Sequence, residues 1–174
     1  MASGAYLSIR REEERDYDLI DEIETAAFGE PGEAQLVRSL RNAATPNLSL
    51  VAILRDELVG HAFLSPVTIE DAPTAPACAG LAPLAVRPDV QGEGIGDALV
   101  RAALDACSSL GWEAVFLLGD PSYYVRFGFT LSAPRGLRYE SEAYDPGFQV
   151  LEIVPGALES CRGWVRYHRA FDDL

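Results

Sequence analysis

Three glycines at alternate positions lie where an apolar run meets a helical pattern. The run ends at Val86, and the next ten residues read RPDVQGEGIG, which places the glycines at Gly92, Gly94 and Gly96. Backbone N–H groups at a helix N-terminus, together with the positive end of the helix dipole, bind anions. Because glycine lacks a Cβ, a phosphate can approach such a turn closely. The segment is therefore a candidate phosphate site; the alternative is a tight strand-to-helix turn whose glycines serve only packing.

Two common phosphate-binding motifs do not fit this turn. The dinucleotide motif G-x-G-x-x-G, started at Gly92, requires glycine at position 97, which is Asp97. The P-loop string G-x-x-x-x-G-K-[ST] occurs nowhere in the chain. The pattern that does fit is Q-x-x-G-x-G, formed by Gln91, Gly94 and Gly96.

Tyr123 and Tyr124, which follow Asp120-Pro121, are a second set of residues with possible chemistry. A phenol has a reference pKa near 10 and stays protonated at neutral pH, so it can donate a proton to a leaving group. The alternative is that both rings pack in the core. The three cysteines are far apart and form no C-x-x-C pair, and there are only two histidines. This pattern excludes a disulfide framework and a metal centre, and Cys107 is expected to pack.

Helical and strand patterns alternate along the chain and predict a mixed α/β fold. Apolar residues recur at helical spacing in Arg15–Phe28, Ala34–Arg41, Gly94–Leu110 and Ser122–Phe127. Strands are predicted at Tyr6–Arg10, Leu48–Leu54, Leu58–Ile69, Leu81–Val86, Ala114–Leu118, Phe148–Val154 and Gly163–Phe171, with a loop at Asp71–Ala79. Pro83 should lie at an edge or a bulge, because proline cannot donate to a ladder. The composition shows no break, so we expect one domain over residues 1–174.

The chain is strongly acidic. It has 14 Lys and Arg against 27 Asp and Glu, a net charge of −13. This charge repels phosphate backbones and argues against a nucleic-acid partner, and it is compatible with a cationic substrate. No apolar run reaches membrane-spanning length, and Met1–Glu14 becomes charged too early for a signal peptide. We expect a cytoplasmic protein with no membrane partner.

The Q-x-x-G-x-G turn resembles the pyrophosphate-binding loop of the GNAT acetyltransferase superfamily. The preceding LAPLAVRP, residues 81–88, looks like the fourth strand of that family. The segment LGDPSYYVRFGF, residues 118–129, is similar to one found in a bacterial subgroup of predicted N-acetyltransferases. The chain ends look like the same subgroup, with Ala27-Phe28-Gly29 near the start and VPGAL, Tyr167 and Phe171 near the finish. The resemblance spans nearly the whole chain.

This resemblance implies a twisted mixed sheet with flanking helices. Its two central parallel strands, Leu81–Val86 and Ala114–Leu118, would splay to admit the pantetheine arm of coenzyme A. Acetyl-CoA would be the co-substrate, with no metal. The coenzyme-binding residues implied by the resemblance are Leu84, Ala85, Val86, Gln91, Gly92, Glu93, Gly94, Ile95, Gly96, Asp97, Tyr123 and Phe127.

The implied activity is direct transfer of acetyl from acetyl-CoA to a primary amine of a small molecule or peptide. The backbone N–H of Val86 would stabilise the oxyanion, and Tyr124 would act as the general acid, with Tyr123 packing or touching the cofactor. The alternative is a non-catalytic acyl-CoA-binding or regulatory module that keeps the glycine turn. Oligomeric state is open, a homodimer being the commonest arrangement.

Two features of the sequence depart from the family or stay unassigned. Glu93 and Asp97 stand where the family often has basic or neutral residues, and each opposes the helix dipole by roughly 0.3–1 kcal/mol when exposed. These two carboxylates are therefore expected to affect the affinity for the coenzyme. The general base is not identified. Glu24, Glu70 and Glu140 are acidic candidates for which a solvated surface position is expected, and His61 is expected to be a satisfied strand side chain.

Overall fold

The computed structural model describes residues 6–174, and they form two compact units that both contain helices and strands. Unit 1 comprises residues 6–64, 82–103 and 169–174, and unit 2 comprises 65–81 and 104–168. The start of the charged N-terminal stretch, residues 1–5, lies outside the described part. The prediction of a single domain is not tested by this division and stays a prediction.

Unit 1 is built on an antiparallel ladder. The strands are β1 (Leu7–Arg11), β2 (Leu48–Leu54) and β3 (Glu57–Ile69), with β2 paired to both of the others. Arg55 and Asp56 join β2 to β3 with φ of 52° and 65°, which is the backbone of a two-residue hairpin turn. β2 has the predicted bounds.

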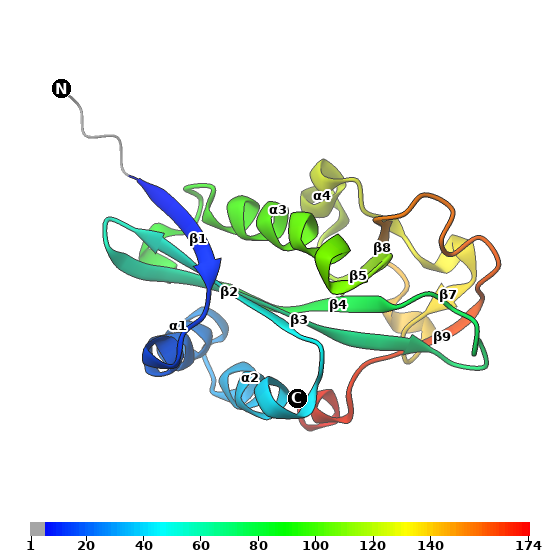
Figure 1. Ribbon diagram of the computed structural model, residues 1–174, viewed down its shortest axis with the longest axis horizontal. Coiled ribbons are helices and arrows are strands. Elements are labelled where there is room, and N and C mark those ends of the chain that lie inside the picture. The colour runs from blue at the N-terminus through cyan, green and yellow to red at the C-terminus, as the bar shows by residue number, and fades with distance from the viewer. Residues whose placement is uncertain (1–5) are drawn as a thin grey trace. The chain divides into compact units, whose positions relative to one another are not determined.

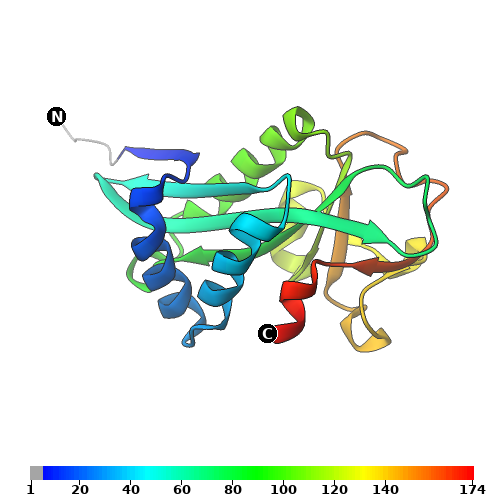
Figure 2. The same cartoon turned by 60° about the horizontal axis from the view of Figure 1, so that its bottom comes forward.

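Two helices cover one face of this ladder (Figures 1 and 2). These are α1 (Tyr17–Phe28) and α2 (Gly32–Ala43). Apolar side chains at helical spacing pack against the sheet in a buried cluster that includes Ile20, Ile23, Leu36, Val37, Leu40, Val51 and Phe63. Helix α1 ends at Phe28, as predicted, and Gly29 with φ of 78° forms its left-handed cap.

The opposite face of the ladder carries the first part of α3 (Ile95–Cys107) (Figure 1). Gly60 of β3 permits this approach, because a Cβ there would lie 3.0 Å from side-chain atoms of Ile95 and Leu99. The predicted helix extended to Leu110. The structure ends α3 at Cys107 and continues as a 3₁₀ turn, Ser108–Leu110, before Gly111 with φ of 78°.

Strand β4 (Cys78–Val86) begins earlier than predicted. Residues 78 and 79, predicted as loop, are drawn into the strand because Cys78–Gly80 pairs in parallel with Ala114–Phe116. Pro83 lies farther along β4 and follows a cis peptide bond. Because Pro83 lies outside the Cys78–Gly80 pairs, its missing N–H removes no hydrogen bond from that pairing.

Unit 2 combines parallel and antiparallel pairs. Beside β4 lies β5 (Ala114–Leu118), which pairs antiparallel with β8 (Phe148–Glu152), and β8 pairs with β6 (Thr130–Leu131). The end of β3 pairs with β9 (Gly163–Arg166), which pairs in parallel with β7 (Leu137–Arg138). The predicted mixed sheet is confirmed. Its core includes Phe116 and Phe148, whose rings stack 5.6 Å apart.

Two late strands are shorter than predicted. β8 stops at Glu152 instead of Val154, and β9 stops at Arg166 instead of Phe171. Residues Arg169–Asp173 form a 3₁₀ helix, and Phe171 packs on the apolar cluster of unit 1. The partly buried Phe171 ring therefore packs from a 3₁₀ helix where a strand was predicted. Within residues 6–174, no helix is long and apolar enough to span a membrane.

Candidate functional site

The end of β4 alternates between buried and half-exposed side chains. Ala85 is 2% exposed and joins the apolar cluster under α1 and α2, whereas Leu84 and Val86 are half-buried. The Arg87 N–H donates to the Val59 carbonyl oxygen at 2.8 Å, which fixes the strand end against β3. The Gln91 side-chain amide donates to the Val86 carbonyl oxygen at 3.0 Å, which folds the glycine turn back onto the strand.

Two glycines of the turn have a conformation that favours glycine. Gly92 and Gly94 have φ of 80° and 84°, in the left-handed region. A Cβ built on either would meet no atom within 4 Å. Packing therefore does not explain these two glycines. The backbone conformation does, and the backbone lies open to a bound group.

The turn leads directly into α3. The Ala98 N–H donates to the Gly94 carbonyl oxygen at 3.1 Å, so the N–H groups of Ile95 and Gly96 precede this helical bond. N–H groups at this position have no partner within their own helix and point along its positive dipole end. The geometry is that of an anion site.

The charges around the turn are acidic. Glu93 is exposed and Asp97 is half-buried. Arg87 is committed to other carboxylates, with its guanidinium 2.6 Å from an Asp89 oxygen and 2.8 Å from a Glu57 oxygen. Because these ion pairs occupy the Arg87 guanidinium, its charge does not offset the charges of Glu93 and Asp97.

Unit 2 holds the predicted tyrosines on a short helix, α4 (Pro121–Tyr124), followed by a 3₁₀ turn, Val125–Phe127. The Asp120 carboxylate accepts from the Ser122 N–H at 2.9 Å and caps the helix, and Pro121 occupies its first position. Gly119 provides room for the Tyr124 ring, because a Cβ at Gly119 would lie 2.5 Å from it.

The Tyr124 ring is fixed by aromatic neighbours. Its centroid lies 4.8 Å from that of Tyr123 and 5.9 Å from that of Phe129, both edge-on. Burial raises the pKa of Tyr124 above its usual value, so the phenol stays protonated at neutral pH. A protonated phenol held in one orientation can serve as a proton donor.

Tyr123 makes a different set of contacts. The Arg126 guanidinium lies 4.3 Å from the centre of the Tyr123 ring, and its Nε donates to the Tyr123 carbonyl oxygen at 2.8 Å. The Phe127 ring lies 5.5 Å from that of Tyr123. The structure thus places the predicted site residues in two groups, the β4 end with its turn in unit 1 and the aromatic group in unit 2.

The surface position expected for Glu24 is wrong. Glu24 is fully buried, and its Oε1 lies 2.6 Å from Nδ1 of His61. The other ring nitrogen of His61 lies 2.8 Å from the Ser49 hydroxyl, so three buried polar side chains form one chain. Sequence reasoning missed Glu24 although a signal existed, because it follows Ile20 by one helical turn and lies on the same apolar face. His61 is satisfied, as expected.

The other two acidic candidates match their expected surface positions. Glu70 is about half exposed and its carboxylate accepts from Nε of Arg166 at 2.7 Å. Glu140 is exposed. Cys107 is buried, which agrees with a packing role, and burial raises the pKa of its thiol to about 11.

Burial moves the pKa values of Glu24 and His61 in opposite directions. Burial, with the charges of Glu33 and Asp21, raises the pKa of Glu24 to about 9, and burial lowers that of His61 to about 4. The pair therefore carries no net charge at neutral pH.

This pair predicts a pH dependence of stability. Between pH 4.5 and about 9 the folded state holds a proton on Glu24 that the unfolded state has lost, so stability falls as pH rises. His61 has the opposite effect on stability, because the unfolded state holds a proton on it that the folded state has lost, but only between about pH 4 and 6.5. We expect the free energy of unfolding to fall from pH 6.5 to 9, and Glu24→Gln to flatten that slope. Urea unfolding across this range checks it, and parallel slopes for the two proteins would show that Glu24 is already ionised in the fold.

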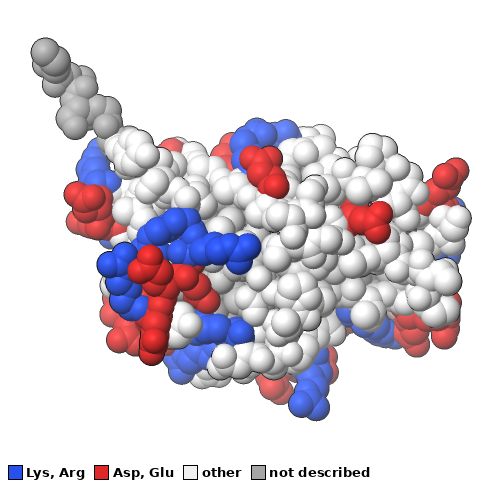
Figure 3. Space-filling model, in the orientation of Figure 1, with Lys and Arg blue, Asp and Glu red and all other residues white. Residues whose placement is uncertain are grey.

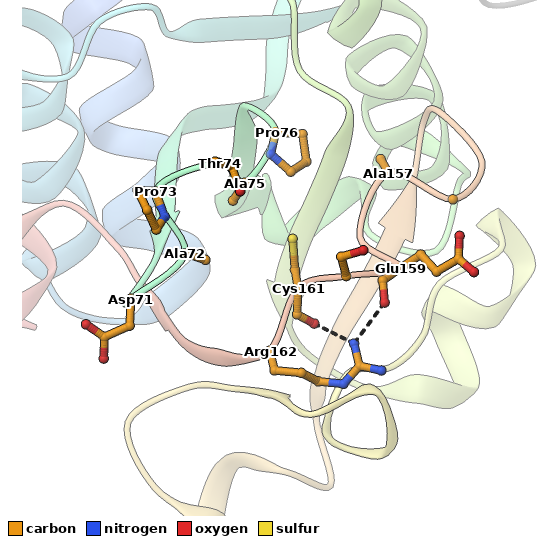
Figure 4. Close-up of a pocket in the computed structure, with 12 residues that line it drawn as sticks. Asp71, Ala72, Pro73, Thr74, Ala75, Pro76, Ala157, Glu159, Cys161 and Arg162 are labelled. Atoms are coloured by element: carbon orange, nitrogen blue, oxygen red, sulfur yellow. Dashed lines mark hydrogen bonds between the residues drawn. The ribbon is translucent and has the colours of Figure 1, made fainter.

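A cavity of about 560 Å³ lies in unit 2 between residues 71–76 and 156–162 (Figure 4). Arg162 borders it and donates to the carbonyl oxygens of Glu159 and Cys161, at 3.2 and 2.7 Å. None of the predicted site residues lines this cavity. Over the described part of the chain, no group of three or more His, Cys, Asp or Glu side chains could hold a metal ion.

Comparisons with known proteins identify the family of this chain. The family model described as the acetyltransferase (GNAT) family matches residues 17–129. The uncharacterized N-acetyltransferase YhbS of Escherichia coli strain K12 is 36% identical over 154 residues, which are 88% of this chain and 91% of YhbS.

Two solved structures extend the comparison to three dimensions. The crystal structure of Escherichia coli YhbS in complex with CoA has a TM-score of 0.90 and 34% identity, covering 99% of this chain and 95% of that one. A GNAT family acetyltransferase from Brucella melitensis in complex with acetyl-CoA has a TM-score of 0.78 and 36% identity, covering 96% and 99%. The predicted fold and family are confirmed. The chain belongs to the GNAT acetyltransferase family and is an N-acetyltransferase.

Proposed function

We propose that this N-acetyltransferase binds acetyl-CoA with the coenzyme's diphosphate on the Gln91–Asp97 turn and transfers the acetyl group to a primary amine. The observation that carries the proposal is the open backbone of the turn, where Gly92 and Gly94 have positive φ and nothing lies within 4 Å of their Cβ positions. The helix that follows supplies N–H groups and a positive dipole end for the diphosphate. The relatives crystallised with CoA and acetyl-CoA support the choice of ligand.

The rest of the coenzyme is assigned from the family resemblance. Leu84 and Val86, the half-buried residues at the end of β4, would line the pantetheine arm with Ala85 between them. Glu93, Ile95, Gly96 and Asp97 complete the turn, and Tyr123 and Phe127 are the aromatic contacts. A backbone amide held by a strand is rigid enough to meet a developing charge.

The proposed reaction is a single displacement. The neutral amine attacks the thioester carbon, a C–N bond forms, and the carbonyl oxygen becomes an oxyanion that accepts from the Val86 N–H. The C–S bond then breaks, and the thiolate of CoA takes the phenolic proton of Tyr124. The ammonium centre gives its proton to solvent, and Tyr124 is reprotonated from solvent. No covalent acyl-enzyme is needed.

The contact with the phosphate-bearing end of the coenzyme is tested by comparing acetyl-CoA with acetyl-pantetheine, which lacks the diphosphate and the 3′-phosphoadenosine attached to it. We expect calorimetry to show clear binding of acetyl-CoA and binding of acetyl-pantetheine weaker by at least about 100-fold, because several charge-assisted hydrogen bonds are lost. Equal affinities would place the diphosphate outside the protein and remove the turn from the site.

Glu93→Lys is expected to tighten acetyl-CoA binding. The exposed Glu93 carboxylate opposes the diphosphate, and a charge near a helix N-terminus contributes roughly 0.3–1 kcal/mol, so reversal should gain several-fold in affinity at low salt. The gain should shrink at high salt, where exposed charges are screened. Glu22→Lys, an exposed residue of α1, makes the same charge change as a control. An unchanged affinity at low salt would mean that Glu93 points away from the phosphates.

A further inference from the structure

Gln149 is a polar side chain buried in the middle of a strand. It is 1% exposed, and β8 is paired on both sides there, with Leu117 of β5 opposite Gln149 on one side and Leu131 of β6 on the other. A leucine or methionine would fill this place without the cost of burying an amide. The proposed acetyl transfer assigns Gln149 no role so far, and its hydrogen bonds have to explain its presence.

The side-chain amide of Gln149 ties two backbone carbonyls together. Its Nε2 donates to the Gly119 carbonyl oxygen at 3.1 Å and to the Gly147 carbonyl oxygen at 3.2 Å. The Gly119 N–H donates to the same Gly147 oxygen at 2.9 Å. This last bond continues the β5–β8 ladder beyond the Leu118–Phe148 pair, and the amide fixes the peptide that follows it.

The two tied residues have little stiffness of their own. Both are glycines, and glycine loses more backbone freedom on folding than any other residue. A Cβ would be crowded at either position, because it would lie 2.5 Å from the Tyr124 ring at Gly119 and 3.0 Å from the Gly119 carbonyl oxygen at Gly147. The close packing that favours glycine here also removes a source of rigidity, which the Gln149 amide supplies.

Tyr124 takes its position from this segment. Its ring lies against Gly119, as the 2.5 Å distance from a Cβ there shows. Asp120, the next residue, starts α4: its carboxylate caps the helix at Ser122, and its carbonyl oxygen accepts from the Tyr124 N–H at 3.1 Å. The orientation of the Gly119–Asp120 peptide therefore sets both the start of the helix and the surface on which the phenol ring lies.

The contacts of Gln149 are electrically neutral. An uncharged amide donates to uncharged carbonyls, and most of the surface around β8 carries no charged residue on the face seen in Figure 3. Salt screens interactions between exposed charges and has little effect on buried groups. Any influence of Gln149 should therefore be the same at low and at high salt.

We propose that Gln149 is a positioning residue for acetyl transfer, which holds the Gly119 peptide and through it the phenol of Tyr124 where its proton reaches the thiolate of CoA. The inference rests on the proposed role of Tyr124 as the general acid. Gln149 touches neither substrate nor coenzyme in this role. A displacement of a reacting group by about 1 Å can cost on the order of 100-fold in rate, so a loose Gly119 peptide should slow catalysis without weakening coenzyme binding.

Gln149→Met keeps the length of the side chain and removes the amide, and the position of the Tyr124 ring is its first readout. The protein would be labelled with 3-fluorotyrosine, and the fluorine signal of Tyr124 is the one that Tyr124→Phe removes. We expect Gln149→Met to shift or broaden this signal, because the ring loses its fixed support. An unmoved Tyr124 signal in folded Gln149→Met would overturn the proposal.

Thiol release from acetyl-CoA measures the functional consequence, with an amine that the wild type acetylates or with water as a slow acceptor. We expect Gln149→Met to lower kcat by about 10- to 100-fold at low and at high salt, with KM for acetyl-CoA within about twofold of wild type. In a Tyr124→Phe background the same substitution should cost less than about twofold, because residues that act as a unit are not additive. Equal losses in both backgrounds would show that Gln149 does not act through Tyr124 and would overturn the proposal.

Glu152→Met is the matched control on the same strand. The Glu152 carboxylate accepts from the Leu158 N–H at 2.9 Å, so this variant also cuts a bond from a β8 side chain to the backbone, but to a segment that does not carry Tyr124. It should keep the kcat and the Tyr124 signal of the wild type even where its stability falls. A loss of kcat as large as that of Gln149→Met would attribute both losses to general destabilisation and overturn the proposal.

Gly147→Ala reaches the same carbonyl from the other side and decides the matter if Gln149→Met does not fold. Its Cβ would lie 3.0 Å from the Gly119 carbonyl oxygen and displace it, so kcat should fall and the Tyr124 signal should shift. A wild-type kcat and signal in folded Gly147→Ala would then overturn the proposal.

Tyr124→Phe alone keeps the failure of this inference apart from that of the proposed function. A near-wild-type kcat in Tyr124→Phe, or no thiol release from the wild type, refutes the proposed function and the role of Gln149 with it. A slow Tyr124→Phe beside a fast Gln149→Met refutes the role of Gln149 alone.

Discussion

Tyr124→Phe is expected to lower the rate of acetyl transfer by about 10²- to 10⁴-fold, or about 3–5 kcal/mol in the barrier, while acetyl-CoA binding stays near wild type. The substitution keeps the ring that packs beside Gly119, Tyr123 and Phe129 and removes only the phenolic proton. The loss should appear in kcat more than in KM, because proton donation to the thiolate occurs only in the transition state. Steady-state kinetics with an amine that the enzyme acetylates measures the change in kcat and KM. Calorimetry measures acetyl-CoA binding.

Tyr123→Phe is the internal control. Tyr123 is held through its carbonyl oxygen and ring by Arg126, and neither contact uses the hydroxyl, so the variant should lose much less activity. Near-full turnover of Tyr124→Phe, with chemistry shown to be rate-limiting, would contradict the assignment. The thiolate would then leave unassisted or take its proton from water, and Tyr124 would have a packing role.

Gly94→Val is expected to abolish measurable acetyl-CoA binding. Its φ of 84° is strained for a β-branched residue, and the new side chain would stand where the diphosphate approaches the backbone. Backbone strain alone costs on the order of 1–3 kcal/mol and affects folding. Calorimetry on the folded fraction separates the loss of binding from the loss of stability.

Gly111→Val is the matched control for that strain. Gly111 has φ of 78° and, like Gly94, nothing within 4 Å of its Cβ position, but it caps the C-terminal end of the α3 segment. We expect the two variants to be destabilised alike and only Gly94→Val to lose the coenzyme. Unchanged affinity in folded Gly94→Val would show that the turn does not hold acetyl-CoA.

Local signals predicted much of the fold. β2 and β5 have the predicted bounds because β5 is a continuous apolar run, β2 is apolar except for Ser49, and both are ended by polar or glycine residues. The end of α1 could be predicted because Gly29 ends the helix through its own left-handed backbone conformation, which requires no distant contact. The start of β4 and the C-terminal 3₁₀ helix were missed because long-range pairing and the burial of Phe171 decide them, and neither leaves a local pattern.

The site likewise has parts that local sequence predicts and parts that depend on long-range contacts. The glycine turn and the capped tyrosine helix are local, and the sequence located both. The environment of Glu24 is not local, since its partner His61 lies 37 residues away on a strand. Helical spacing could have indicated the apolar face for Glu24, four residues after Ile20, but only the tertiary fold supplies the imidazole that makes its burial tolerable.

Turnover with an amine panel tests whether this chain transfers the acetyl group of acetyl-CoA to an amine. The purified chain would be mixed with acetyl-CoA, with and without each amine, while thiol release is followed and the N-acetylated amine is identified by mass spectrometry. We expect thiol release that depends on the amine and matches the acetylated product mole for mole. Acetyl-CoA binding without amine-dependent thiol release for any amine would contradict it and would identify the chain as a non-catalytic acyl-CoA-binding module.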